Sequence, residues 1–378
     1  MNSISEEFYR SWLTSLIGIS LFCAGIWLLT WNEGRAVHHA DVLDEAYNTV
    51  ISLNAYESAK REYDGDLIHI GGPIIVEEPL TEPDYGIAIQ AVKLKRRVQM
   101  YQWVEEVTTK STNEMGANSD VQDYYYDTEW RDKLVDSSNF YIRHGHQNPK
   151  EIPLKTRTFI APYVRIGRIN LGKEIKKKFN DYVEVTSDER PDNKNIKLHL
   201  GIYYHCEDVW NPEVGDIRVQ FYYAGLSGDP VTVIAMQKDG ILVPYVTSKG
   251  HEIALIRHGL LSVDDMFAAE HSDAKIETWK YRAIGMFILY ASSVCLARLL
   301  KVAFNNVPML RSIFSQEISN YFNLVISLSV SLFVIAMAWI AYRPMLGVAL
   351  LMAAVSPFMY CSINLYNTVQ MQNGYYNR

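Results

Sequence analysis

The chain has 378 residues, with 36 Lys and Arg against 43 Asp and Glu, and a formal net charge of -7. The charge is unevenly distributed, because residues 33–282 hold 40 acidic and 30 basic side chains and the rest of the chain holds 3 and 6. An acidic, aromatic-rich central block is a poor nucleic-acid binder, so we expect no nucleic-acid partner.

The first apolar segment, Ser11 to Asn32, carries no charged side chain. A helix needs about 20 apolar residues to cross a bilayer, so the sequence predicts a transmembrane helix over residues 12–31. The run is long for a signal peptide and lacks small residues at a cleavage position, which favours a retained signal anchor. Residues 1–11 are then a short cytoplasmic N-terminus.

The polar block over residues 33–282 is predicted to be a lumenal α+β domain. Its strands show apolar residues at even spacings, which is typical of a half-buried sheet. We expect strands at Ile87–Val104, Tyr124–Trp130 and Ile217–Tyr223, with Ser111–Val121 as a loop, and a hairpin from Val231 to Tyr245 that turns at Asp239 and Gly240. The fold is therefore predicted to be mainly antiparallel β-sheet, with the basic run Lys93 to Arg97 on a solvated face.

Helices are predicted to flank the sheet. Residues 41–53 form one candidate, and Leu171, Ile175 and Phe179 line one face of a second, short and lysine-rich helix. Ser262 with Asp265 three residues later resembles a capping box that opens a helix at residue 263. We expect this last helix to continue unbroken into the second membrane span.

The central block also contains a possible internal duplication, over residues 60–182 and 195–275. Leu67–Gly71 is echoed by Leu198–Gly201, and Val98–Tyr101 is echoed by Val219–Tyr222. Chance similarity among Gly, Pro and aromatic residues is the alternative.

Three further apolar segments crowd the last quarter of the chain and predict transmembrane helices over residues 283–304, 318–342 and 345–365. Arg343 and Pro344 mark the tip of a helical hairpin between the last two. Basic residues near span ends favour the cytoplasmic side, and the loop over residues 305–317 and its flanks carry Arg298, Lys301 and Arg311. Both termini, including the tail over residues 366–378, are then cytoplasmic.

Cysteine and glycosylation signals are sparse. Cys206 is the one cysteine of the central block, so this domain cannot form an internal disulfide, and the chain contains no N-x-S/T sequon. Both observations indicate an internal membrane facing the endoplasmic reticulum lumen, the perinuclear space or a bacterial periplasm.

No set of residues predicts catalysis, a metal site or a cofactor. His205 and Cys206 lack the further ligands that zinc needs, and a thiol nucleophile at Cys206 with His205 or His199 is a weak alternative. His144 and His146 fit a solvated turn. The segment from Gly225 to Gly228 lacks the Lys and Ser/Thr of a phosphate-binding loop and predicts a tight turn.

The predicted third span contains Ser327, Ser329 and Ser331. Small hydroxyl residues let membrane helices approach closely and can hydrogen-bond across them, so these serines are candidate helix-packing positions. The alternative is that each serine bonds its own helix backbone. The clean spans hold no charged residue at mid-depth, which argues against a pump or ion-coupled carrier.

Several motifs resemble the LUMA (transmembrane protein 43) family over nearly the whole chain. They include N-E-G-R-A after the first span, A-V-K-L-K-R-R-V-Q-M-Y-Q-W-V-E, D-T-E-W-R, G-H-Q-N-P, P-E-V-G-D-I-R-V, Y-A-G-L-S-G-D and Y-R-P. The positions that carry the resemblance include Asn32, Glu33, Gly34, Arg35, Trp130, Arg131, Gly215, Asp216, Gly225 and Gly228.

This resemblance implies a four-span protein of the endoplasmic reticulum and inner nuclear membrane whose lumenal domain self-associates and organises nuclear-envelope proteins. The family's partners are of the emerin and lamin type, with membrane lipid around the spans. Bacterial members would occupy an internal or cell membrane instead. The predicted function is a non-enzymatic scaffold. The alternatives are a membrane-associated enzyme or lipid-handling protein and, less favoured, a channel or transporter subunit.

Overall fold

The computed structural model describes residues 12–54, 61–114, 117–186, 195–305, 320–340 and 344–357, together with 191, 193 and 359. The chain divides into two compact units. The helical unit comprises Met1–Glu45 and Phe267–Arg378, and the sheet unit comprises Ala46–Met266. The predicted domain boundaries at residues 33 and 282 stay a prediction. In this division, residues 33–45 and 267–282 are part of the helical unit.

The helical unit contains most of the long helices α2 (Trp12–Thr49) and α4 (Val263–Asn305), all of α6 (Asn320–Ile340), and a shorter apolar helix, Pro344–Pro357. Two described segments, Trp12–Thr49 and Asn323–Ile340, are long and apolar enough to cross a membrane. The α+β class with apolar helices at both ends is confirmed, and the count of four spans stays a prediction. The predicted N-terminal segment, cytoplasmic loop, tail and Arg343 lie outside the described residues.

Helix α2 continues without interruption through residues that were predicted to separate two helices. The predicted helix over residues 41–53 is thus the end of α2, and Leu53 lies in strand β1. Asn32, Glu33 and Gly34 do not end the helix. The capping prediction for α4 is confirmed, since Ser262 Oγ lies 2.7 Å from Asp265 Oδ2 and accepts from Asp265 N at 3.1 Å.

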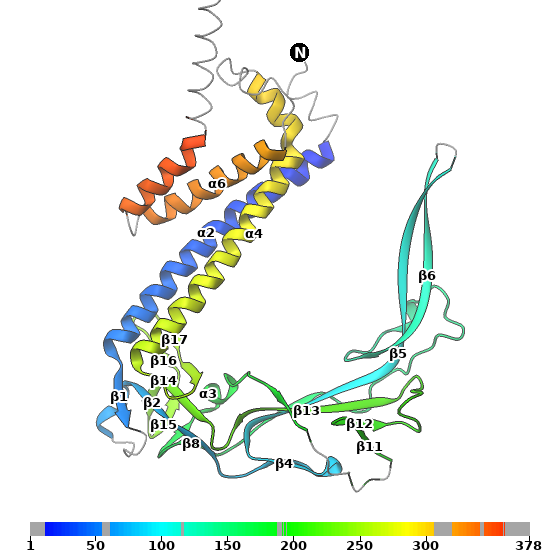
Figure 1. The fold of residues 1–378 in the computed structure, drawn as a ribbon, viewed down its shortest axis with the longest axis vertical. Coiled ribbons are helices and arrows are strands. Elements are labelled where there is room, and N and C mark those ends of the chain that lie inside the picture. Colours follow the sequence, from blue (N-terminus) through cyan, green and yellow to red (C-terminus); the bar gives the residue numbers. More distant parts are fainter. Residues whose placement is uncertain are drawn as a thin grey trace, which may run out of the picture. The chain divides into compact units, whose positions relative to one another are not determined.

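Helices α2 and α4 run side by side, as Figure 1 shows. Glycines of each helix contact leucines of the other. A Cβ added to Gly285 would lie 2.6 Å from Leu29 Cδ2, and one added to Gly25 would lie 2.9 Å from Leu289 Cδ2. The two leucine side chains are almost fully buried. Each leucine thus fills the space over a glycine of the opposite helix, which brings the two backbones close together.

The first sheet of the sheet unit forms a small barrel. Its strands follow the order β1-β2-β8-β9-β15-β14-β18, and a further pairing between β2 and β14 closes the ring. The bounds are β1 (Ile51–Asn54), β2 (Leu67–Val76), β8 (Val164–Ile166), β9 (Ile169–Leu171), β14 (Pro230–Lys238), β15 (Ile241–Val243) and β18 (Leu255–His258). The pairings β1–β2 and β9–β15 are parallel and the others antiparallel.

The second sheet follows the order β11-β12-β13-β5-β6, with β10 also paired to β13 and β7 to β5. The bounds are β5 (Ala91–Glu114), β6 (Ala117–Arg131), β7 (Arg157–Ile160), β10 (Val183–Glu184), β11 (Lys197–His199), β12 (Ile202–His205) and β13 (Ile217–Leu226). Two small hairpins pair β3 (Leu80–Glu82) with β4 (Ile87–Ile89) and β16 (Tyr245–Val246) with β17 (Glu252–Ile253). The mainly antiparallel sheet is confirmed, and so is the turn at Asp239 and Gly240, where both residues have positive φ.

The predicted loop over residues 111–121 is wrong. Strands β5 and β6 stay paired as far as Glu114 and Ala117. The polar segment that indicated a loop instead belongs to two paired strands. Thr is enriched in strands because its branched side chain fits a pleated surface.

The proposed duplication remains a prediction, and only some of its matched segments occupy the same kind of secondary structure. Val98 and Val219 lie opposite each other in the β5–β13 pair, as two equivalent strands can. Leu67–Gly71 lies inside strand β2, however, whereas Leu198–Gly201 forms the tight turn between β11 and β12.

Two lysines pack into the barrel side of the sheet unit instead of facing solvent. Lys93 is 5% exposed and its Nζ donates to Lys177 O and Asn180 Oδ1, while Lys176 Nζ donates to Ala161 O and Pro162 O. Burial lowers the pKa of both side chains. The predicted solvated face is thus wrong for Lys93, which ties β5 to helix α3 (Lys173–Lys177).

The glycine packing can be tested with one substitution at two sites. We expect Gly285→Ala to lower the melting temperature of the detergent-solubilised chain, because the new Cβ would collide with buried Leu29. Gly34→Ala is the matched control, since nothing lies within 4 Å of its Cβ. Replacing a mid-helix glycine without a collision stabilises by about 0.5–1 kcal/mol. Two variants that shift the melting temperature equally would contradict this packing.

A second prediction concerns His69, which is buried on β2 and bonded to Ser52 Oγ and Leu261 O, each at 3.0 Å. Burial lowers the pKa of His69 below 6.5. The unfolded chain then binds more protons than the folded chain below pH 6.5, so stability falls as the pH drops from 6.5 toward the folded pKa. Thermal unfolding of the full chain between pH 7.5 and 5 should show this loss, and His69→Gln should make it shallower.

Candidate functional site: a buried polar junction in the helical unit

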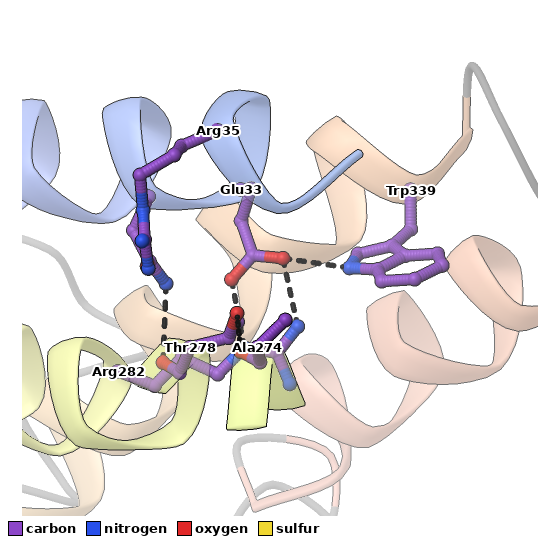
Figure 2. A network of polar contacts seen from close by, with 7 residues as sticks. Glu33, Arg35, Ala274, Thr278, Arg282 and Trp339 are labelled. Atoms are coloured by element: carbon purple, nitrogen blue, oxygen red, sulfur yellow. Dashed lines mark hydrogen bonds and ion pairs between the residues drawn. The ribbon is translucent and has the colours of Figure 1, made fainter. Parts of the chain in front are cut away.

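The helical unit contains a buried ion pair that joins three helices. Glu33 of α2 is fully buried, and it accepts from Arg282 of α4 through Nε to Oε1 and Nη2 to Oε2, both at 2.7 Å. Trp339 of α6 donates its Nε1 proton to Glu33 Oε2 at 2.8 Å. Figure 2 shows the carboxylate between the guanidinium and the indole. A bidentate pair with a third donor satisfies a buried carboxylate well, because each oxygen accepts a charge-assisted bond.

Neighbouring polar residues extend this junction along α2 and α4. Asn32 is fully buried and donates from Nδ2 to Thr278 O at 3.2 Å, while the Thr278 hydroxyl donates to Ala274 O at 2.7 Å. Arg35 pairs with Glu277 at 2.7 Å and donates to Asn32 Oδ1 at 3.3 Å. The junction therefore fixes the register of α2 against α4 by directional bonds.

Aromatic rings surround both arginines. The Arg35 guanidinium carbon lies 5.5 Å from the Trp31 ring centre and 5.0 Å from that of Tyr281, and the Arg282 carbon lies 4.9 Å from that of Trp279. Trp31 and Tyr281 also meet edge to face at 5.5 Å. Trp and Tyr concentrate at membrane–water interfaces. Their position agrees with the predicted ends of the first and second spans, at residues 31 and 283.

The motif N-E-G-R thus has a structural role that its sequence did not reveal. Asn32, Glu33 and Arg35 were singled out only by family resemblance, and the structure brings all three into one network with α4. Arg282 and Trp339 were not predicted at all. The sequence did contain a clue, because Glu33, Arg282 and Trp339 each lie near an end of a predicted span. Three consecutive spans that alternate in direction bring these three ends to the same side of the membrane.

The three predicted packing serines are all buried on α6. Ser327 Oγ donates to Leu324 O at 2.8 Å and Ser331 Oγ donates to Ser327 O at 2.7 Å, so these two bond their own helix. Serines of α4 make the cross-helix bonds instead. Ser292 donates to Gly18 O at 2.8 Å and Ser293 to Asn323 O at 3.3 Å.

The same helices enclose a cavity of about 70 Å³. Its wall consists of Phe22, Leu289, Ser292, Ser293, Leu296, Ile326, Ser327 and Val330. Because the wall serines turn their hydroxyls toward backbone carbonyls, the cavity is apolar.

The remaining resemblance positions lie in the sheet unit and stabilise strand contacts. The Trp130 ring packs on Tyr204 at 5.9 Å and beneath the Arg218 guanidinium at 4.8 Å, and Arg131 pairs with Glu129 at 2.7 Å. Gly215 and Asp216 share backbone bonds with Tyr101 beside β5.

Two family glycines shape the end of β13. Gly225 has φ 71° and a Cβ there would lie 2.8 Å from Phe179 Cδ1, so only glycine fits. Gly228 lies in the turn into β14 with φ 98°, which agrees with the predicted tight turn. Pro344 begins the last described helix, at the position where a missing N–H costs nothing.

The weakly predicted metal and thiol positions are occupied by packing contacts. His205 Nε2 lies 3.0 Å from Tyr85 Oη, and the His146 ring stacks on Tyr126 at 4.0 Å. Burial raises the pKa of the Cys206 thiol, which is opposite to the shift of an activated nucleophile. Within the described residues, no group of three or more His, Cys, Asp and Glu could hold a metal ion.

The architecture defines a membrane protein in which apolar helices flank an inserted mixed α+β domain. The sequence profile of the family Transmembrane protein 43 matches residues 100–344. The Transmembrane protein 43 homolog of Drosophila melanogaster is 44% identical over 369 residues, covering 97% of this chain and 98% of its own length. Transmembrane protein 43 of Homo sapiens is 33% identical over 352 residues, covering 91% and 88%.

Rattus norvegicus Transmembrane protein 43 is likewise 33% identical over 352 residues. The chain belongs to the Transmembrane protein 43 family. No solved structure matches it.

The buried ion pair can be tested by removing one partner at a time. We expect Glu33→Gln to destabilise the chain by about 3 kcal/mol or more, because Arg282 would remain buried and uncompensated. Trp339→Phe should cost less, roughly 1.5–3 kcal/mol for one bond to a charged acceptor. Denaturant unfolding in mixed micelles, followed by Trp fluorescence or circular dichroism, measures both.

The control is the exposed pair, in which Arg35 and Glu277 are 29% and 51% exposed. Glu277→Gln should change stability by at most about 1 kcal/mol, as is usual for solvated ion pairs. Equal losses of stability in Glu33→Gln and Glu277→Gln would show that the buried ion pair contributes no more to folding than the exposed one.

Proposed function

We propose that this protein is a multi-pass scaffold of the endoplasmic reticulum and inner nuclear membrane. In this proposal it self-associates and organises nuclear-envelope membrane proteins through its lumenal domain, with emerin-type and lamin-type proteins as partners. Family membership supports the membrane assignment. The charge distribution around the predicted spans supports a lumenal domain.

The observation that carries the proposal is the extension of β5 and β6 beyond the rest of their sheet. We name the paired segments Glu105–Glu114 and Ala117–Tyr126 the ribbon. Figure 1 shows it projecting from the body of the sheet. A two-stranded ribbon is at best marginally stable by itself, so a projecting one is stabilised when a partner covers it. Exposed strand edges are templates for such pairing.

The base of the ribbon is fixed by a loop that packs against one face. Glu105 Oε2 accepts from Tyr126 Oη and from Tyr141 N, both at 2.6 Å, and the Tyr141 ring stacks on Tyr124 at 4.4 Å. Asn148 bonds the Trp103 backbone through both its Oδ1 and its Nδ2. This support makes the ribbon a defined surface from its first residues, as an interaction element requires.

The proposal is tested by proximity labelling in cells with a ribbon-shortened variant. Residues 107–124 are replaced by Asn-Gly, which joins the directly paired Glu106 and Tyr125 through a two-residue turn. The labelling enzyme is placed in the exposed turn at residues 248–250 or in the predicted cytoplasmic loop over residues 305–317. We expect the domain label to mark lumenal parts of nuclear-envelope membrane proteins, and the shortened variant to lose this marking.

Correct membrane targeting of the shortened variant is the control, measured by microscopy. Unchanged labelling after shortening would contradict the role of the ribbon. Labelling of cytosolic proteins by the domain label would contradict the proposed topology.

A further inference from the structure

The outer edge of β5 is free of backbone partners along the ribbon, in the part of the chain that the structure describes. Up to Met100 this edge pairs with β13, Tyr101 bonds Gly215 and Asp216, and Trp103 bonds Asn148. The alternation of the strand points the N–H and C=O groups of residues 105, 107 and 109 to the same edge. Residues 106–109 are exposed.

We infer that a second copy of this chain pairs antiparallel with this edge around a twofold axis at Thr108. The inference deepens the self-association in the proposed function and rests on it. The edge offers a continuous row of backbone groups, and it contains Val107, Thr108 and Thr109, types that favour strands. A β-strand added to an open edge gains its affinity from main-chain hydrogen bonds.

Charge favours this register of the pairing. With Thr108 opposite Thr108 of the second copy, Glu106 faces Lys110 of the second copy and Lys110 faces its Glu106. Opposite charges directly across a strand pair are favourable, and like charges are unfavourable. Moving the twofold axis from residue 108 to residue 110 would place Lys110 opposite itself, so the charges disfavour that register. Glu105 would face Ser111, which is neutral.

Side-chain geometry also favours a contact at residue 108. Val107 and Thr109 direct their backbone N–H and C=O groups to the open edge, so they form hydrogen-bonded pairs with the second copy. Thr108 directs these groups to β6 and therefore occupies a non-hydrogen-bonded pair. At such pairs the two Cα atoms are about 4.5 Å apart and the side chains meet. This separation lies within the range that a disulfide spans.

The test is disulfide trapping in the full chain, in lipid nanodiscs or mild detergent, in a Cys206→Ser background. We expect Thr108→Cys to form a disulfide-linked dimer on mild oxidation. Thr109→Cys is the matched control and should not form this dimer. Residue 109 faces residue 107 of the second copy, so the two introduced cysteines would have Cα atoms beyond about 7 Å apart, too far for a disulfide. Both sites are exposed, so folding is preserved.

Charge variants check the register independently. Glu106→Lys should weaken dimerisation roughly tenfold, because two favourable pairs become repulsive, and adding Lys110→Glu should restore it. Light scattering of the unmodified chain measures self-association separately. If the unmodified chain is a dimer but Thr108→Cys forms no disulfide-linked dimer, pairing through the β5 edge is contradicted and self-association is not. A monomeric unmodified chain would contradict both self-association and the pairing. Equal disulfide formation at residues 108 and 109 would contradict the register with Thr108 opposite itself.

Discussion

The buried carboxylate of Glu33 is the constraint on which the helical unit depends. A fully buried charge is costly unless it is paired and hydrogen-bonded, so α4 must supply Arg282 and α6 must supply Trp339 at the same level. Apolar contacts alone are non-directional and select one position of two helices only weakly. The directional bonds at Glu33 and Asn32 define the register of α2 against α4, which is the best-attested use of buried polar groups in helix pairs.

The sheet unit combines a closed barrel with a second sheet from which two strands extend. The barrel removes strand edges by pairing β2 with β14, and its interior is filled by aliphatic side chains from every strand. The second sheet instead leaves β5 and β6 to continue past their neighbours. One part of the unit thus minimises exposed backbone, whereas the other displays it, and this contrast makes the ribbon the natural place for an interaction.

The segments at which the chain enters and leaves the sheet unit are hydrogen-bonded within that unit. Within the sheet unit, the backbone at Gly259 and Leu261 is held by Thr232 Oγ1 and by His69, immediately before the capped start of α4. Tyr47, in the last turn of α2, donates to Asp264 at 2.8 Å. The last turn of α2 and the first turn of α4 are therefore bonded to each other inside the sheet unit.

Local patterns in the sequence determined much of this protein. The uncharged run before Asn32, the alternation along Ile217–Tyr223, the Asp239–Gly240 turn and the Ser262 cap each act over a few residues, and each appears as predicted. Local polarity misled at residues 111–121 and at Lys93, because a polar segment can be a paired strand and a lysine can be buried when carbonyls accept its bonds. The closure of β2 on β14, the parallel β1, and the meeting of Glu33, Arg282 and Trp339 join residues up to 306 positions apart. Only the tertiary structure decides these, since long-range partners are chosen by packing and by the need to satisfy buried polar groups.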